Sequence, residues 1–388
     1  MSFAVVNLGC RVNRAESDAI TNKMLESDVL APTETADTVF VNTCTVTGVA
    51  EKKTRKTVRH VLETNKNATV IVTGCAAEID PSFFESLSGR VRVVPKFELL
   101  SNSQDNFYEG PQNMSRVNVK IQDGCNNACT FCIVHVARGK SVSVPQSDVV
   151  KNCIALDKAG VKEIVLTGIN LGNYSDPSLA ELLNTLLDNT HSCRFRISSI
   201  EPPEVTDNLL EVINDADWRV CHHFHLPLQS GSDNVLKRMD RHYSFDDFSE
   251  LVKKTRFLMP NFSFTTDIIV GFPGETEEDF KQTLNVANEV SFSKIHVFPY
   301  SKREGTPAAE MPDQIPDVVK KKRAKQLREL SDKLRRREFL KRVGELEFVV
   351  TENNNLATTD SYFTIKSSNF SSPGQLLNVE LKEDMFVE

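Results

Sequence analysis

The sequence predicts an α/β protein with a parallel sheet in its main part and a small β domain at its carboxyl end. Short apolar runs alternate with segments of helical periodicity as far as about residue 300. A long basic helical segment follows, and after it come short strands without intervening helices. The chain of 388 residues also exceeds what one hydrophobic core usually organises, so several domains are expected.

The first domain is expected to span residues 1–97 as a small α/β unit. Strands are predicted at Phe3–Asn7, Thr38–Val41 and Thr69–Thr73, and helices at Arg14–Ser27 and Val46–Thr64. Each strand runs into a cysteine, in order Cys10, Cys44 and Cys75, beside Asn13, Asn42 and Gly74. Parallel strands bring their carboxyl ends to one edge of a sheet, so the three thiols should converge. The alternative is three buried cysteines that only pack.

A second set of three cysteines opens the main domain, which is expected over residues 115–343 after a polar linker at 98–114. Cys125, Cys129 and Cys132 have C-x3-C-x2-C spacing on a loop rich in Gly and Asn. A cubane iron–sulfur cluster normally takes four thiolates, so three leave one iron open to a substrate or cofactor. The alternatives are three reduced thiols, or a zinc site with His135 as its fourth ligand.

Repeated strand–helix units continue to about residue 300 and favour a parallel, barrel-like sheet with its chemistry at the strand carboxyl ends. The expected strands are Glu163–Thr167, Arg194–Ser198, His222–Leu226, Ser263–Val270 and Lys294–Phe298. The expected helices are Ser147–Ala159, Ser178–Asp188, Pro203–Ala216, Phe245–Met259 and Glu277–Val290. Distinctive loops rich in Gly, Ser and Pro follow four of these strands, at residues 166–170, 198–202, 226–232 and 270–276.

The last two parts of the chain carry net charges of opposite sign. A helix is expected over about 316–342, and the stretch from Val318 to Gly344 carries a net charge of +9. Leu327, Leu330 and Leu334 recur at helical spacing, so one face should pack and the basic face remain outside. The last domain, 344–388, is acidic, with strands expected at Glu347–Thr351, Tyr362–Lys366 and Leu376–Leu381.

The composition of the chain indicates the cellular compartment in which the protein works. No apolar run approaches the roughly 20 residues of a membrane helix, and the N-terminal residues lack the basic and apolar regions of a signal peptide. The nine cysteines are an odd number, and six lie in loops, which favours a cytosolic metalloprotein over a disulfide scaffold. We therefore expect a cytoplasmic, monomeric protein without a membrane contact.

Together, the three separated cysteines, the C-x3-C-x2-C loop with Phe131 before its last cysteine, and the strand-end loops resemble the radical S-adenosylmethionine (SAM) methylthiotransferases. This family has an N-terminal cluster domain, a partial (β/α)6 barrel and a small C-terminal TRAM domain, and the resemblance covers nearly the whole chain. Residues 42–47, 199–202 and 296–309 look most like the MtaB branch. That branch converts N6-threonylcarbamoyladenosine, next to the tRNA anticodon, into its 2-methylthio form. The chain departs from the family pattern at His135-Val136 and in its short, acidic C-terminal domain.

The resemblance implies two 4Fe-4S clusters, one on Cys10, Cys44 and Cys75 and one on Cys125, Cys129 and Cys132. The second would reduce SAM to a 5′-deoxyadenosyl radical, and the first would hold the sulfur that another SAM methylates. The expected SAM contacts are Gly168, Ser199, Glu201, Gln229, Ile269 and Gly271, with Val270 beside them. Each could instead have only a folding role. Residues expected either to meet substrate charge or to be solvated are Arg138, Arg241, Lys302 and Arg303.

The implied substrate is a tRNA anticodon stem-loop, whose target base must be splayed out to be reached. Phosphate contacts are expected from the basic helix, or from the run Lys52, Lys53, Arg55 and Lys56, with a merely solvated basic helix as the alternative. A reducing electron donor such as flavodoxin or ferredoxin is also implied. Three functions remain as alternatives: the MiaB branch on isopentenyl-adenosine tRNA, the RimO branch on a ribosomal-protein aspartate, and a non-catalytic iron–sulfur electron carrier.

Overall fold

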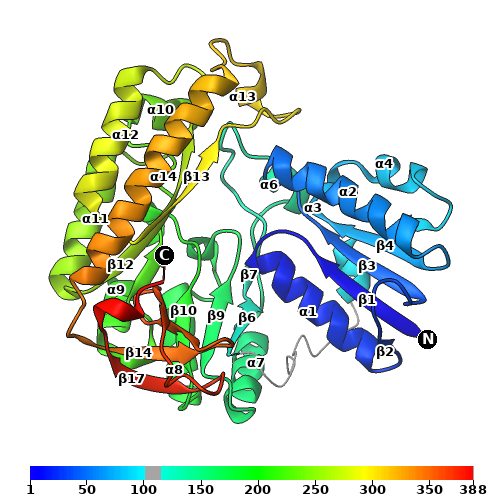
Figure 1. The fold of residues 1–388 in the computed structure, drawn as a ribbon, viewed down its shortest axis with the longest axis horizontal. Coiled ribbons are helices and arrows are strands. Elements are labelled where there is room, and N and C mark those ends of the chain that lie inside the picture. Colours follow the sequence, from blue (N-terminus) through cyan, green and yellow to red (C-terminus); the bar gives the residue numbers. More distant parts are fainter. Residues whose placement is uncertain (101–114, 388) are drawn as a thin grey trace.

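The protein has three parts, which the computed structural model describes over residues 1–100 and 115–387. The N-terminal α/β domain stands beside a partial barrel, and a small C-terminal sheet lies against the barrel (Figure 1). The α/β class, the barrel and the C-terminal β domain expected from the sequence are confirmed. Among the described residues, no helix combines the length and the apolar character needed to cross a bilayer.

The N-terminal domain is a five-stranded parallel sheet in the order β2-β1-β3-β4-β5. Its strands are β1 (Ser2–Asn7), β2 (Val29–Leu30), β3 (Thr38–Thr43), β4 (Thr69–Gly74) and β5 (Val91–Val93). Its helices are α1 (Arg11–Leu25), α2 (Gly48–Thr64), α3 (Cys75–Ile79), α4 (Pro81–Ser86) and α5 (Lys96–Leu100). The three predicted strands are confirmed, whereas β2 and β5 are too short to give a periodic pattern.

The first three residues of the expected linker at 98–114 belong to α5, which continues to Leu100. Residues 101–114 lie outside the described part of the chain.

The barrel has six parallel strands in two groups, β10-β9-β6 and β11-β12-β13, joined by parallel bridges from Phe195 to Val220 and from Ser199 to His225. The strands are β6 (Arg116–Lys120), β9 (Glu163–Thr167), β10 (Arg194–Ile197), β11 (His223–His225), β12 (Ser263–Val270) and β13 (Lys294–Pro299). A short antiparallel pair, β7 (Gln122–Asp123) and β8 (Val142–Ser143), flanks the cysteine loop. The sequence did not predict β6, in which polar and apolar residues alternate over only five positions.

The helices of this part are α6 (Val134–Arg138), α7 (Gln146–Lys158), α8 (Leu179–Asn189), α9 (Asp207–Asp215), α10 (Asp233–Arg238), α11 (Phe245–Leu258), α12 (Glu277–Val290), α13 (Pro307–Glu310) and α14 (Asp317–Leu340). The longer ones cover the outer face of the barrel, whereas α6 contacts α3 of the N-terminal domain (Figure 1). The helix predicted over 203–216 is broken. Residues Pro202–Glu204 form a 3-10 turn, and α9 starts only after Thr206, whose side chain accepts from the Leu209 N–H as an N-cap.

The C-terminal sheet is antiparallel in the order β16-β15-β14-β17. Its strands are β14 (Leu346–Thr351), β15 (Leu356–Thr359), β16 (Thr364–Lys366) and β17 (Leu376–Glu380). The strand predicted from Tyr362 begins at Thr364 instead, because Tyr362 has a φ of 70° in a turn. Phe339 at the end of α14 is buried in the core of this sheet, which ties it to the barrel.

A buried ionic cluster at the start of the barrel strands anchors this sheet. Glu163 is fully buried and pairs with Arg194 at 2.7 Å and Arg196 at 2.8 Å. Arg194 also donates to the carbonyl of Phe348, and Arg196 to the carbonyl of Asp360. The two guanidinium groups therefore connect the acid inside the barrel to the backbone of the C-terminal sheet.

Candidate active site

The first three cysteines meet at the carboxyl edge of the N-terminal sheet. Cys10 precedes α1, Cys44 directly follows β3 and Cys75 begins α3, and the strands before them are adjacent and in register. Burial raises the pKa of Cys44, and the neighbouring Cys75 and Cys10 raise it further. Gly9 has a φ of 117°, and a Cβ there would come within 2.8 Å of the Cys44 Cβ. The expected convergence of the three thiols is therefore present.

A buried amide pair supports this edge. Asn13 donates to the Asn42 side chain at 3.1 Å and to the Thr43 carbonyl at 2.8 Å, and Asn42 donates back to the Asn13 carbonyl. The Oδ1 atom of Asn13 accepts from Cys10 Sγ at 3.4 Å. These hydrogen bonds fix the backbone on which the thiols stand.

The second three cysteines lie on the loop between β7 and α6. Burial raises the pKa of Cys132 to about 11, and Cys129 and Cys125 contribute to the same shift. Hydrogen-bond donors point at each sulfur: the Asn127 N–H at Cys125, the Val134 N–H at Cys132, and Arg241 Nη1 at Cys129, at 3.2–3.4 Å. Donors to sulfur are what cluster thiolates require, so both the spacing and the surroundings fit a cluster.

The residues expected to contact SAM all lie at the carboxyl ends of barrel strands, on the side of the cysteine loop. Gly168 follows β9, Ser199 and Glu201 follow β10, and Gln229 follows β11, while Ile269 lies at the end of β12 and Gly271 directly after it. Glu201 accepts from Asn127 at 3.0 Å and from Arg241 at 2.9 Å, which connects it to the cysteine loop. Ile269 belongs to an apolar cluster that includes Phe131.

Two residues at the end of β12 have packing roles. Val270 is fully buried in the core between the sheet and the helices, because alternate residues of a strand face opposite sides. Its side chain therefore lies on the other face of the strand from Ile269. Gly271 has a φ of 72°, and a Cβ there would come within 2.2 Å of the Lys320 side chain, so this glycine permits the close approach of α14.

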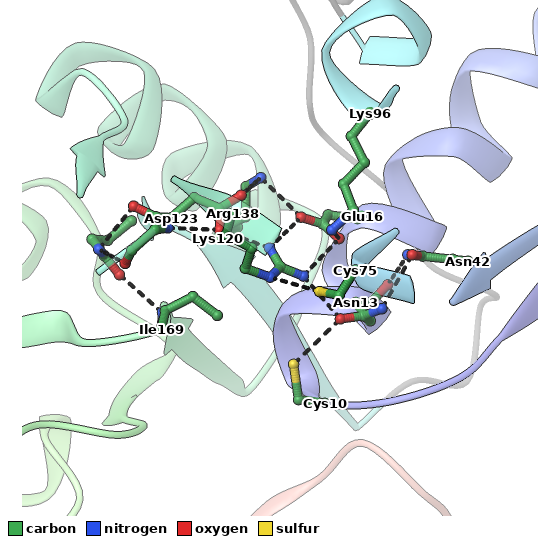
Figure 2. A network of polar contacts seen from close by, with 12 residues as sticks. Cys10, Asn13, Glu16, Asn42, Cys75, Lys96, Lys120, Asp123, Arg138 and Ile169 are labelled. Atoms are coloured by element: carbon green, nitrogen blue, oxygen red, sulfur yellow. Dashed lines mark hydrogen bonds and ion pairs between the residues drawn. The ribbon is translucent and has the colours of Figure 1, made fainter. Parts of the chain in front are cut away.

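Arg138 reaches from the barrel to a cysteine of the N-terminal domain (Figure 2). It follows the cysteine loop at the end of α6, and its Nε donates to Cys75 Sγ in the other domain at 3.1 Å. Its Nη atoms bind Glu16, Asp123 and Asn13 at 2.7–2.9 Å. The side chain is only 3% exposed. The expectation that Arg138 meets substrate charge or solvent is wrong, because protein acceptors occupy its donors.

Glu16 is the acidic centre of the contact between the domains. It is buried on α1 and pairs with Lys96, Lys120 and Arg138 at 2.8–3.2 Å. The three cations overcome the cost of burial and hold the pKa of Glu16 well below its usual value. Sequence reasoning missed Glu16, because its partners lie up to 122 residues away.

The remaining arginines expected near the substrate also have protein partners. Arg241 pairs with Glu201 and is buried. Arg303 contacts Glu51 at 2.5 Å and the Thr45 hydroxyl, which makes a second contact between barrel and N-terminal domain. Lys302 is exposed and lies 4.0 Å from Glu310.

A polar cluster that the sequence did not indicate lies on β11, β12 and β13. His225 Nε2 is 3.4 Å from Asp267 Oδ1, and the His225 and His296 rings are 5.8 Å apart. Thr265 contacts His225 Nδ1 at 3.1 Å and so fixes its ring. Asp267 on β12 pairs in register with His296 on β13, and two residues further along the same strands Ile269 pairs with Phe298. Because alternate residues of a strand share a face, both pairs lie on the same face of the sheet. The cluster therefore lies one layer below the apolar residues that pack on Phe131.

The basic helix is only partly available to a partner. Arg323 on α14 and Arg342 just after its end are buried and pair with Glu275 and Glu347. The exposed cations of α14 and its C-cap are Lys321, Lys322, Lys325, Arg328, Lys333, Arg336, Arg337 and Lys341. Figure 1 shows α14 on the other side of β13 from the N-terminal domain. On α2, by contrast, exposed Lys52, Lys53 and Lys56 follow closely after Cys44.

Comparison with known proteins agrees with this arrangement. Residues 119–287 match the family described as "Radical SAM superfamily", and residues 2–94 match "Uncharacterized protein family UPF0004". The threonylcarbamoyladenosine tRNA methylthiotransferase MtaB of Bacillus subtilis is 39% identical, over 94% of this chain and 90% of that protein. A tRNA-2-methylthio-N(6)-dimethylallyladenosine synthase of Dictyoglomus thermophilum is 34% identical, over 91% and 88%.

Among solved structures, the radical SAM methyltransferase TsrM of Kitasatospora setae superposes with a TM-score of 0.60. The alignment covers 79% of this chain and 77% of that one at 13% identity. This likeness supports the fold alone.

Proposed function

The chain belongs to the tRNA methylthiotransferases of the radical SAM superfamily, and we propose that it converts N6-threonylcarbamoyladenosine next to the tRNA anticodon into its 2-methylthio derivative. One observation carries this proposal: two groups of three free cysteines lie on either side of a domain boundary, and Arg138, which follows the second group in the chain, donates to Cys75 of the first. A site that only transfers electrons would saturate its irons with four thiolates.

Two 4Fe-4S clusters and SAM are the cofactors of this reaction. We propose that Cys125, Cys129 and Cys132 hold one cluster and Cys10, Cys44 and Cys75 the other. When bound, these groups supply one-electron reduction of SAM and a sulfur atom for transfer. Among the chain's own residues, Arg241 and the backbone N–H groups of the cysteine loop orient the thiolates. The apolar layer of Phe131, Ile269 and Phe298 keeps water away from the space above the barrel.

The substrate's N6 substituent supports the threonylcarbamoyl branch. This substituent carries a carboxylate, a hydroxyl group and a urea group, whereas a dimethylallyl group carries no polar atom. We propose that it reaches the polar cluster of His225, Asp267 and His296, because these partly exposed groups can hydrogen-bond polar atoms of the substituent, whereas an apolar group would take them out of water without replacing that contact. The dimethylallyl branch is the second candidate. Its apolar substituent would be better matched by apolar side chains at the positions of His225, Asp267 and His296.

Mass spectrometry of tRNA nucleosides tests the function. Anaerobically reconstituted protein, dithionite and SAM are incubated with tRNA that carries N6-threonylcarbamoyladenosine, and separately with tRNA that carries isopentenyladenosine. We expect the 2-methylthio product from the first tRNA only. SAM cleavage without product on either tRNA would contradict the proposed substrate and redirect the search to a ribosomal-protein aspartate.

Substitutions in the polar cluster should affect the substrate and not the radical chemistry. We expect His296→Phe and Asp267→Leu to lower kcat/KM for the threonylcarbamoyl tRNA about 10- to 100-fold, because each removes a hydrogen-bonding group that faces the substituent. SAM cleavage without tRNA should be unchanged. The control is His191→Phe, an exposed histidine on the loop before β10. Equal kinetics for His296→Phe and the control would remove this cluster from substrate recognition.

We propose that the exposed lysines of α2 contact tRNA phosphates, because this helix begins four residues after Cys44. Replacing Lys52, Lys53 and Lys56 by alanine should weaken tRNA binding and reduce the slope of log K against log salt by about 2 to 3. Replacing the exposed lysines Lys322, Lys325 and Lys333 on α14 is the matched comparison. A larger change from the α14 variant would move the tRNA to the other side of β13.

We further propose that the protein works as a cytoplasmic monomer and takes electrons from a donor such as flavodoxin or ferredoxin. Light scattering reports the mass in solution, and replacement of dithionite by reduced flavodoxin tests the donor. A dimeric mass would contradict the monomer, and no SAM cleavage with reduced flavodoxin or with reduced ferredoxin would contradict the proposed electron donor.

A further inference from the structure

We propose that Arg138 is a positioning residue that couples the two cysteine sites: it sets the reduction potential of the N-terminal site through Cys75 and fixes that site relative to the cysteine loop. This inference rests on the proposed function, because it assumes that Cys75 is a cluster ligand. It concerns a single side chain that starts in one domain and ends on a sulfur atom of the other (Figure 2).

The contacts of Arg138 leave little freedom for its guanidinium group. Nε donates to Cys75 Sγ at 3.1 Å, Nη1 donates to Glu16 at 2.9 Å and to Asp123 at 2.7 Å, and Nη2 donates to Asn13 at 2.9 Å. Asn13 in turn accepts from Cys10. The planar fork of arginine can serve these acceptors at once, whereas the point charge of lysine cannot. The guanidinium group therefore touches one thiol of the N-terminal site and an amide that binds a second.

The position of Arg138 in the chain makes this a link between the sites. It is six residues after Cys132 and one helical turn of α6 away from the cysteine loop, and α6 contacts α3, which begins at Cys75. A displacement of the cysteine loop would therefore pull on Cys75. The comparable contact of Arg241 with Cys129 stays within the barrel and joins no second site.

The electrostatic consequence follows from charge. A permanent cation with an N–H on a thiolate sulfur stabilises the more negative, reduced state of a cluster bound there. Burial strengthens the effect, because little water screens the charge at a side chain that is 3% exposed. Removal of this cation should make the N-terminal cluster harder to reduce.

Lys120 provides a matched control. It pairs with the same two carboxylates, Glu16 at 3.2 Å and Asp123 at 3.1 Å, and it also crosses the domain boundary. It has no contact with a cysteine among its described hydrogen bonds. Loss of Lys120 therefore weakens the boundary without removing the donor to Cys75.

The test is a redox titration of the N-terminal cluster followed by electron paramagnetic resonance, with Cys125, Cys129 and Cys132 replaced by alanine so that only this cluster remains. In that background we expect Arg138→Met to lower the reduced-to-oxidised ratio at fixed potential by about tenfold, which is 59 mV for one electron. Lys120→Met should cause no shift, and Arg138→Lys should restore part of it. Equal shifts for Arg138→Met and Lys120→Met, or none for either, would overturn the inference.

Two further measurements keep the result interpretable. Circular dichroism and iron content show whether the Arg138 variants fold and load, and Arg138→Gln replaces Arg138→Met if that variant does not. In the protein with both sites intact, Arg138→Met should form several-fold less methylthiolated product per SAM cleaved than Lys120→Met. Because the titration needs no tRNA, a wrong substrate assignment would leave the predicted shift in potential intact, which separates failure of the function from failure of this inference.

Discussion

Cys129→Ala is expected to abolish SAM cleavage, whereas Cys44→Ala should leave SAM cleavage intact and abolish methylthio transfer. Cys129 stands on the barrel loop beside the expected SAM contacts, where Arg241 and Glu201 connect it to the end of β10. Cys44 is at the edge of the other domain, after β3. Loss of a thiolate from one site should unload that site alone, because no cysteine is shared between them.

Three readouts separate these outcomes on anaerobically reconstituted protein: iron per chain, 5′-deoxyadenosine formed, and 2-methylthio nucleoside formed. Each variant should lose about half of the iron, since a cubane holds four irons. Cys153→Ala is the matched control, because Cys153 is buried in the barrel core on α7 and belongs to neither site. Loss of SAM cleavage in Cys44→Ala with the barrel cluster still loaded would refute the division of labour between the two sites.

The strands that lead to the cysteines were predictable, because each is apolar and ends in a recognisable loop. Periodicity placed β9, β10, β12 and β13 to within a residue or so. The rule that parallel strands share a carboxyl edge then brought Cys10, Cys44 and Cys75 together. Their roles as ligands remain proposals, but the grouping needed only local patterns and one rule of sheet geometry.

The side chains that connect the domains were not predictable, because their partners are distant in sequence. Arg138 lies in a readable motif, yet its acceptors Glu16 and Cys75 lie 122 and 63 residues before it. The polar cluster likewise needs three strands to pair in one register before His225 meets Asp267 and His296. Nothing in the local pattern distinguishes such residues from solvated ones.

The largest effect on stability is expected from Glu163→Gln. The carboxylate of Glu163 is fully buried between Arg194 and Arg196, and a neutral amide would leave two guanidinium groups without a counter-charge. Removing one partner of a buried ionic group costs about 3–5 kcal/mol. The same arginines donate to the Phe348 and Asp360 carbonyls, so we expect the C-terminal sheet to detach first. Glu211→Gln, an exposed glutamate on α9, is the control and should change stability by less than about 0.5 kcal/mol.

Trp218 makes this measurable, because it is the only tryptophan of the chain and its ring lies 5.4 Å from that of Phe348 on β14. Urea unfolding followed by its fluorescence reports the contact between barrel and sheet.

The pH dependence of urea unfolding shows whether Glu163→Gln destabilises the protein through the lost charge. The two arginines hold the pKa of Glu163 well below its ordinary value of 4.5 despite burial. The ionised carboxylate therefore stabilises the fold fully above that value, and the stabilisation is lost as the pH falls below it. The difference between wild type and Glu163→Gln should be constant near neutrality and shrink below about pH 4. A difference that stayed constant down to pH 3 would mean that the loss came from packing and not from charge.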